Sequence, residues 1–406
     1  MSELNILWVK VGGAWPLDRG GRLRSYHLMA ALARRHRLTV LTTHGGDADP
    51  EGLARALPGA RVASFPHRMA KRDSAGFALS LARSWISPLP VDLWRARVPA
   101  LRAELRARLD SGSVDLCIAD FLAAMPNVPR GGRVPVLLFA HNVEHLIWKR
   151  LAETETRRWR RALLDVEWRK MRRWEAGACA RASFTVAVSE PDRAQLQALA
   201  PRARIAAIAT GVDTGFFAPN GVHERPARLV FTGSMDWYPN EDAILHFIES
   251  ILPAIRRQVP EVALTVAGRH PSARLRAAAR EAGVLVTGTV DDVRPYIAEA
   301  EVYVVPLRVG GGTRLKIFEA LAMGKAVVST STGVEGLPLT PGEHFVEADA
   351  PAAFAAAVVD LLRAPARRRE LGGAGRRLVE ARYSWTQVAG EFETCIGELA
   401  CARRPR

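Results

Sequence analysis

Residues 302–329 constrain the fold of this chain more than any other stretch. Val302–Val305 is a continuous β-branched run, typical of a strand buried on both faces. A glycine run follows at residues 310–312, and the next residues have a helical pattern that closes at Gly324. Ala326–Ser329 is a second buried strand pattern. Two such strands joined by a helix form a parallel pair, so the sequence predicts an α/β fold.

The glycine run precedes the predicted helix, where unpaired backbone N–H groups and the helix dipole favour an anion. Two basic side chains add positive charge there, and a carboxylate on the helix is close enough to reach the hydroxyl pair of a ribose. The segment therefore predicts a site for a nucleoside diphosphate. Its candidate residues are Gly310, Gly311, Gly312, Thr313, Arg314, Lys316 and Glu319.

The segment P-L-R-V-G-G-G-T-R-L-K-I-F-E-A resembles the donor site of retaining GT-B glycosyltransferases of family 4. It is most similar to a bacterial branch of exopolysaccharide and exosortase-associated sugar transferases, which often serve exopolysaccharide or lipid-linked oligosaccharide assembly. Members of the family usually carry two glutamates separated by seven residues. The second falls on Glu319, but Gly311 occupies the position of the first, which often contacts donor-sugar hydroxyls. The resemblance implies that a backbone N–H serves there instead.

Strand and helix patterns alternate through both halves of the 406 residues. With the resemblance, this implies two doubly wound Rossmann-like domains that face a cleft. The expected domains are an acceptor-side domain over residues 1–210 and a donor-binding domain over residues 227–382. A linker rich in glycine and proline covers residues 211–226. Residues 383–406 are expected to form a helix that crosses back to the first domain, with Trp385 packed at the crossing.

In the first half, polar residues follow three predicted strands, and the carboxyl ends of parallel strands bind ligands in open α/β folds. Gly20 and Gly21 come before the first helix, and the family pattern places Gly21 beside the donor phosphate, although an ordinary turn explains the pair too. His141 occupies the position of the family's histidine beside the transferred sugar; the alternative is a structural histidine. Asp120, Asn142 and Glu144 are acceptor-side candidates that also suit helix capping.

In the second half, Gly233 and Ser234 follow a predicted strand and are expected to approach the donor through their backbone. Many relatives place an arginine and a lysine in this turn. The chain has neither, so the resemblance assigns the diphosphate to Arg314 and Lys316. Val290 follows another strand and is the candidate for main-chain contact with the base.

The formal charge of +15 indicates an anionic partner or an arginine-rich proteome. Trp148–Trp174 is rich in arginine and tryptophan, lacks proline and glycine, and is interpreted as one long helix. Two interpretations stay open for this helix: it lies on an anionic membrane surface, or it faces the other domain and has a solvated basic side. The sequence shows no secretory leader, no span of transmembrane length and no cysteine spacing typical of a metal site. We expect a cytoplasmic protein, peripheral on the inner face of the cytoplasmic membrane.

These features lead to one expected function and one alternative. The resemblance implies a metal-independent retaining glycosyltransferase, without a cofactor, that moves a sugar from a nucleoside-diphosphate sugar to a glycan or lipid-linked acceptor. The alternative is a GT-B sugar-nucleotide epimerase, which would need no acceptor. Dehydrogenases require a G-x-G-x-x-G turn after the first strand, and residues 11–16 do not match it. A nucleic-acid partner is not expected, because no basic reading helix or aromatic sheet motif is recognisable.

Overall fold

The computed structural model describes residues 2–17, 20–69, 74–219, 221–309 and 315–401. Contacts divide the chain into two compact units. Unit 1 comprises Met1–Ala209 and Val388–Arg406, and unit 2 comprises Thr210–Gln387. The predicted linker therefore lies in unit 2, and the predicted C-terminal segment is divided at Val388. Among the described residues, no helix is both long enough and apolar enough to cross a bilayer.

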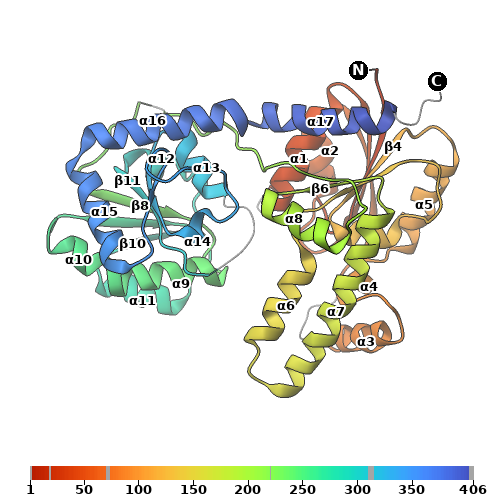
Figure 1. Ribbon diagram of the computed structural model, residues 1–406, viewed down its shortest axis with the longest axis horizontal. Helices are drawn as coiled ribbons and strands as arrows, with labels where there is room; N and C mark the ends of the chain where they lie inside the picture. The colour runs from red at the N-terminus through yellow and green to blue at the C-terminus, as the bar shows by residue number, and fades with distance from the viewer. Residues whose placement is uncertain (1, 18–19, 70–73, 220, 310–314, 402–406) are drawn as a thin grey trace. The chain divides into compact units, whose positions relative to one another are not determined.

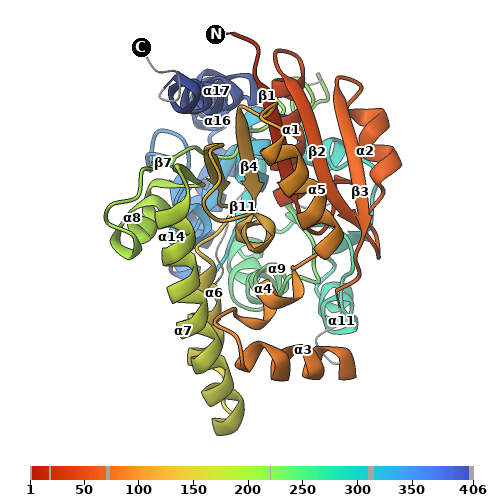
Figure 2. The same cartoon turned by 90° about the vertical axis from the view of Figure 1, so that its right-hand side faces the viewer.

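Unit 1 is built on a parallel sheet in the order β3-β2-β1-β4-β5-β6-β7 (Figures 1 and 2). The order reverses between β1 and β4, which is where open α/β sheets place their ligands. Its strands are β1 (Asn5–Lys10), β2 (Arg37–His44), β3 (Ala60–Pro66), β4 (Leu116–Asp120), β5 (Val136–Phe139), β6 (Phe184–Ala187) and β7 (Ile205–Ala207).

Three helices of unit 1 begin directly after a residue whose side chain caps the helix start. Asp49, Ser74 and Ser189 each accept a hydrogen bond from a backbone N–H of the helix that follows. The helices are α1 (Gly20–Ala33), α2 (Pro50–Ala56), α3 (Ala75–Trp85), α4 (Val91–Arg95), α5 (Pro99–Asp110), the 3₁₀ helix η1 (Leu122–Asn127), α6 (Glu144–Thr154), α7 (Arg158–Arg181) and α8 (Glu190–Leu199).

Unit 2 carries a second parallel sheet in the order β10-β9-β8-β11-β12-β13. Its strands are β8 (Arg228–Thr232), β9 (Ala263–Ala267), β10 (Leu285–Gly288), β11 (Val302–Val305), β12 (Ala326–Ser329) and β13 (Val346–Glu347). Its helices are α9 (Tyr238–His246), the π-helix η2 (Phe247–Ile251), α10 (Leu252–Arg256), α11 (Ala273–Glu281), α12 (Arg294–Glu299), α13 (Leu315–Ala322), α14 (Ser331–Val334), α15 (Pro351–Arg363) and α16 (Pro365–Arg382). Two parallel α/β sheets confirm the predicted fold class.

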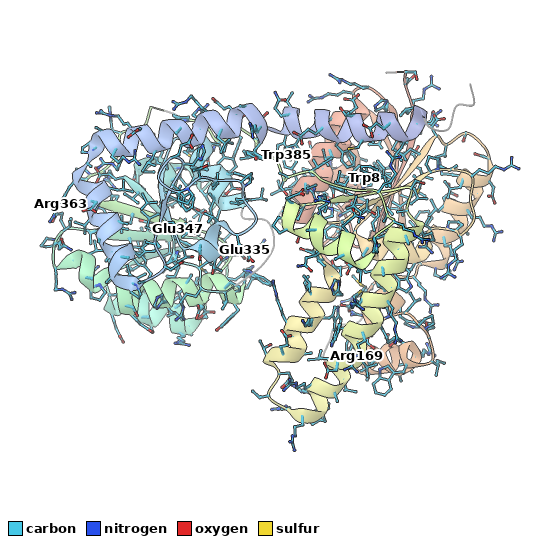
Figure 3. All side chains as sticks on the ribbon, viewed as in Figure 1. Trp8, Arg169, Glu335, Glu347, Arg363 and Trp385 are labelled. Atoms are coloured by element: carbon cyan, nitrogen blue, oxygen red, sulfur yellow. The ribbon has the colours of Figure 1, made fainter. Side chains whose placement is uncertain are left out.

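The last helix, α17 (Trp385–Cys401), belongs to both units. At its start Trp385, labelled in Figure 3, lies against Gly211, where a Cβ would be 2.6 Å from the indole ring. Further along, Phe392 packs in the core of unit 1 against Phe139, with 5.1 Å between ring centroids, and against Trp8. The helix therefore returns to the first unit, as predicted.

The prediction of one helix over Trp148–Trp174 is wrong. The structure has two helices there, α6 and α7, which lie side by side and extend from unit 1 as a hairpin (Figures 1 and 2). The chain turns at residues 155–157 without glycine or proline, and the backbone N–H of Arg157 donates to the Glu155 carboxylate at 2.9 Å. Glu175 of α7 then stabilises the start of α6, because its carboxylate accepts the backbone N–H groups of Glu144 and His145.

Candidate functional site

The carboxyl ends of β1, β4 and β5 bring a buried polar cluster together in unit 1. Lys10 and Asp120 end neighbouring strands and are register partners. The Asp120 carboxylate is fully buried and accepts hydrogen bonds from the Lys10 ammonium at 3.0 Å and from His141 Nε2 at 2.7 Å. It also accepts the indole N–H of Trp8 at 2.9 Å. Lys10 donates in addition to Ser25 of α1, so the cluster ties the helix to the sheet.

The charges in this cluster set its protonation states. Burial raises the pKa of Asp120, but the Lys10 ammonium and the hydrogen bond from His141 outweigh burial and hold that pKa well below its usual range. Burial lowers the pKa of His141 to about 3, with Asp120 opposing the shift. The imidazole is therefore neutral at pH 7. A neutral imidazole that donates from Nε2 to a carboxylate keeps Nδ1 as an acceptor for a substrate hydroxyl.

An aromatic ring covers His141. Phe121 stacks on the imidazole with 3.7 Å between centroids and an interplanar angle of 2°. Its backbone has φ of 68°, a region that bulky residues seldom adopt and that is enriched at functional sites. A Cβ on Gly21 would lie 2.5 Å from the tip of the Phe121 ring. Gly21 is thus required by close packing, and the structure places three predicted residues, Gly21, Asp120 and His141, in one cluster.

A cavity of about 580 Å³ opens beside this cluster. Lys10, Gly21, Phe121 and Glu144 are among the residues that line it. Burial, followed by the negative charge of Glu175, raises the pKa of Glu144 to about 7. Asn142 donates to the Glu144 carboxylate at 3.4 Å. The predicted acceptor-side residues therefore lie near this cavity, whereas Gly20 is an exposed residue at the start of α1.

Unit 2 has a second cluster at the carboxyl end of β8. Gly233 follows the strand with φ of 152°, and a Cβ there would lie 2.7 Å from the Lys316 ammonium. Lys316, from α13, donates to Asn240 at 2.7 Å, and Asn240 donates in turn to the carbonyl of Ser234 at 2.8 Å. Lys316 also lies 3.9 Å from the centre of the Phe231 ring. A glycine turn and a lysine are thus held together by packing from two elements.

Further groups surround this second cluster. Arg269, after β9, donates from Nε to the Ser234 hydroxyl at 2.8 Å. Glu319 lies one turn beyond Lys316 on α13, and burial raises its pKa to about 7, with Lys316 opposing the shift. Val290 follows the edge strand β10, away from β8 in the sheet order, and the structure does not bring it into the cluster. The remaining predicted residues, Gly310, Gly311, Gly312, Thr313 and Arg314, lie outside the described residues.

Several residues of the two clusters were not among the predicted site residues. Lys10 looks like the end of an apolar strand, and only the adjacency of β1 and β4 pairs it with Asp120. Asn240 and Arg269 lie 76 and 47 residues before Lys316 and meet the Gly233 turn through the fold. No group of three or more metal-ligating side chains occurs in the part of the chain that the structure describes.

Two family models match different halves of the chain. The family model "Glycosyltransferase Family 4" matches residues 19–216, and the model "Glycosyl transferases group 1" matches residues 226–364. The phosphatidyl-myo-inositol mannosyltransferase of Mycobacterium tuberculosis is 31% identical over 234 residues, covering 53% of this chain and 60% of that protein. A GDP-mannose-dependent alpha-(1-6)-phosphatidylinositol monomannoside mannosyltransferase of the same species is 29% identical, covering 48% and 56%. The chain thus matches under two thirds of the length of these relatives.

Solved structures match over nearly the whole chain. Sucrose-phosphate synthase from Thermosynechococcus elongatus superposes with a TM-score of 0.70 and 17% identity, covering 98% of this chain and 99% of that one. Anabaena HepE in complex with UDP and glucose gives 0.67 and 13% identity, covering 97% and 100%. WaaG, a glycosyltransferase involved in lipopolysaccharide biosynthesis, gives 0.62 and 14%, covering 95% and 98%. The chain therefore has the GT-B architecture, with a glycosyltransferase family 4 match on its first half and a glycosyl transferases group 1 match on its second.

Proposed function

We propose that the protein is a retaining glycosyltransferase that moves a sugar from a nucleoside-diphosphate sugar to a glycan or lipid-linked acceptor in cell-surface polysaccharide assembly. The observation that carries this proposal is the second cluster, where Lys316 and Asn240 meet the Gly233 turn. A phosphate seated there would be contacted by the Lys316 ammonium group, and Gly233 has no side chain to obstruct its approach. The two family matches support a transferase of this kind.

The donor is expected to contact α13 and the residue that precedes it. Lys316 and Arg314 would hold the diphosphate, and Glu319 would accept hydrogen bonds from the ribose hydroxyls. The HepE complex with UDP and glucose supports a nucleotide-sugar donor in this fold. The mannosyltransferase relatives, named for phosphatidylinositol-based acceptors, support a glycolipid acceptor.

Retention requires that the new bond form on the face from which the diphosphate leaves. The family's first glutamate position is Gly311, so no carboxylate nucleophile is expected there. In our mechanism the bond from the anomeric carbon to the diphosphate oxygen breaks while the acceptor oxygen bonds to the same face. The departing phosphate takes the acceptor's proton, and Lys316 and Arg314 stabilise its charge. His141, neutral and fixed by Asp120, would orient a sugar hydroxyl through Nδ1.

Turnover with a panel of sugar nucleotides and glycolipid acceptors tests this function, with the anomeric configuration of the product read by NMR. We expect a retained configuration and equal rates with and without EDTA. Glu319→Ala should weaken nucleotide binding by roughly 1–3 kcal/mol, and Lys316→Ala should weaken donors far more than the free nucleoside. An inverted product, a trapped glycosyl-enzyme, or unchanged donor affinity in both variants would contradict the proposal. Epimerised donor without any acceptor would favour the epimerase instead.

We also propose that the protein is peripheral on the inner face of the cytoplasmic membrane. Large apolar side chains are exposed on two neighbouring parts of unit 1, the α6–α7 hairpin and α3, which Lys170 joins by donating to the carbonyl of Ser84. They include Trp159 of α7 at 61% exposure and Ile86, directly after α3, at 89%. Apolar side chains among arginines suit the interface of an anionic bilayer.

Co-sedimentation with vesicles tests this location. We expect binding to anionic vesicles at low salt, loss of binding at high salt, and weaker binding when Trp159 is changed to serine or when Arg157, Arg158, Arg160 and Arg161 are changed to glutamine. If the protein stays in the supernatant at low salt, or if these substitutions change nothing, the hairpin is only a solvated surface.

A further inference from the structure

Two cavities in unit 1 have walls rich in arginine. One, of about 480 Å³, lies between the end of β3, α4 and the start of α5. The other, of about 450 Å³, lies between α5, η1 and α7. Arg97 and Arg102 line both cavities, so the two meet at this pair. None of the described residues that line either cavity is aspartate or glutamate. We call this surface the arginine groove; its residues are Arg97, Arg102, Arg106, Arg130 and Arg181.

Two of these guanidinium groups are held in place by neighbours. Arg97 stacks on Trp94 with 3.3 Å from its central carbon to the ring centre, and its Nε donates to the Trp94 carbonyl. Arg181 donates from Nη2 to the carbonyl of Met125 at 3.2 Å and lies 5.7 Å from the Trp174 ring. Stacking fixes the plane of a guanidinium, which reduces the entropy lost when its terminal N–H groups bind an anion.

The groove concentrates positive charge. Burial lowers the pKa of Arg97, and the charge of Arg102 lowers it further. Burial and the charge of Arg130 both lower the pKa of Arg181. Residues 1–209 hold 34 of the 57 lysines and arginines and 19 of the 42 aspartates and glutamates, so they account for the entire formal charge of +15. An anion in the groove would relieve this repulsion.

We propose that the arginine groove binds a phosphate or diphosphate ester group of the acceptor substrate. Paired guanidinium groups match the oxygens of a phosphate. The cavities are small and concave, whereas a nucleic-acid duplex would need a broad surface. The first arginine-rich cavity shares Met69 and Arg95 with the cavity beside His141. An acceptor could therefore place its phosphate at Arg97 and extend its hydroxyl toward Glu144. The role in acceptor binding rests on the proposed function, whereas the anion site itself does not.

Calorimetric titration of the full chain with inorganic pyrophosphate tests the site. Lys316→Ala serves as the background, because it removes the lysine of the second cluster in unit 2. In that background we expect Arg97→Gln with Arg102→Gln to weaken pyrophosphate binding by about tenfold or more, because at least one charge-assisted hydrogen bond is lost. The matched control is Arg61→Gln with Arg202→Gln, two exposed arginines of unit 1 that line neither cavity; it should leave affinity unchanged. Equal affinity in the groove variant and the control overturns the site.

A second measurement keeps the test decisive if the groove variant fails to fold. Pyrophosphate should change the fluorescence of the chain through Trp94 and Trp174, the two tryptophans that line the groove. Trp94→Phe should reduce that change, and Trp94→Phe with Trp174→Phe should abolish it. The absence of any change in the wild type, or a change that survives in the double variant, refutes the proposal.

Two further experiments distinguish a phosphate of the acceptor from the headgroups of a membrane. With a glycolipid acceptor, the groove variant should raise KM about tenfold for the phosphate-bearing form and leave KM for the same glycan without phosphate unchanged. Binding to phosphatidylglycerol vesicles that depends on Arg97 and Arg102, without any pyrophosphate binding, would mean general attraction to a membrane and would overturn the discrete site. Pyrophosphate binding needs no donor and no turnover, so its failure leaves the test of glycosyl transfer untouched.

Discussion

Replacing Asp120 with asparagine should destabilise unit 1 strongly, although the shape of the side chain is preserved. The carboxylate is fully buried and accepts three donors, from Lys10, His141 and Trp8. An amide has only one oxygen acceptor, so its NH₂ group would point at one or more of these donors and lose the hydrogen bonds they make. The Lys10 ammonium would also remain buried without its anion. Breaking a buried ion pair from one side costs about 3–5 kcal/mol.

The pH dependence of this variant follows from the Lys10 ammonium. Burial already lowers the pKa of Lys10, and Asp120 opposes the shift. Without Asp120 the folded state binds fewer protons than the unfolded state at this lysine, so the stability of the variant should rise as pH rises toward the unfolded pKa near 10.5. In the wild type, the depressed pKa of Asp120 gives stability that is present above its unfolded value near 3.8 and lost as pH falls below it. The variant should lack that acid-side loss.

Native-state hydrogen exchange of the β1 and β4 amides is the appropriate assay, because two units make one global unfolding free energy ill-defined. Asp115→Asn is the matched control: Asp115 accepts from the backbone N–H and the side chain of Asn5 and has no cationic partner in the described structure, so we expect a cost of about 1 kcal/mol. Lys10→Met with Asp120→Asn should recover at least about 2 kcal/mol relative to Asp120→Asn alone. The reasoning is refuted if Asp120→Asn costs no more than the control, or if the double variant recovers nothing.

Two more substitutions have outcomes that the structure predicts. Burial raises the pKa of Glu319 from 4.5 to about 7, so the folded state holds this proton more tightly than the unfolded state. Unit 2 should therefore lose stability as pH rises from about 4.5 to about 7. Glu319→Gln should remove this pH dependence and stabilise unit 2 by about 2–3 kcal/mol at pH 8, measured by hydrogen exchange of the β11 amides. A slope that persists in the variant would show that another group titrates. Gly21→Ala places a methyl group 2.5 Å from the Phe121 ring, and overpacking should cost about 1–3 kcal/mol and reduce the proposed transfer activity. Gly177→Ala, in α7 with nothing within 4 Å, is the helical glycine control and should be neutral or stabilising.

Local sequence patterns predicted the central strands well and the hairpin badly, for a physical reason. Val302–Val305 and Ala326–Ser329 are buried on both faces, so each is a continuous apolar run with boundaries that the sequence shows directly. The break between α6 and α7 has no such signal. It depends on Glu155 and on contacts of α7 with α6 that are distant in sequence, including the carboxylate of Glu175.

The candidate site shows the same division. Asp120 and His141 could be singled out because each follows a predicted strand, and strand ends of parallel sheets carry ligand-binding residues. Their mutual contact, and the inclusion of Lys10, depends on the β1-β4-β5 order of the sheet, which the alternation of elements does not specify. The need for a glycine at position 21 becomes clear only from the structure, where the Phe121 ring leaves no room for a Cβ.

The return of α17 to unit 1 has a consequence for the order in which this protein can fold during synthesis. Phe392 fills the aromatic centre of unit 1 between Trp8 and Phe139, and Glu393 pairs with Arg35 at 2.7 Å. The ribosome makes these residues after the whole of unit 2, so the first unit emerges first and is completed last. Until α17 docks, the surfaces of Trp8 and Phe139 that Phe392 covers stay exposed. Nascent chains stalled before residue 388 should therefore bind chaperones more strongly, and resist protease less, than chains released at full length.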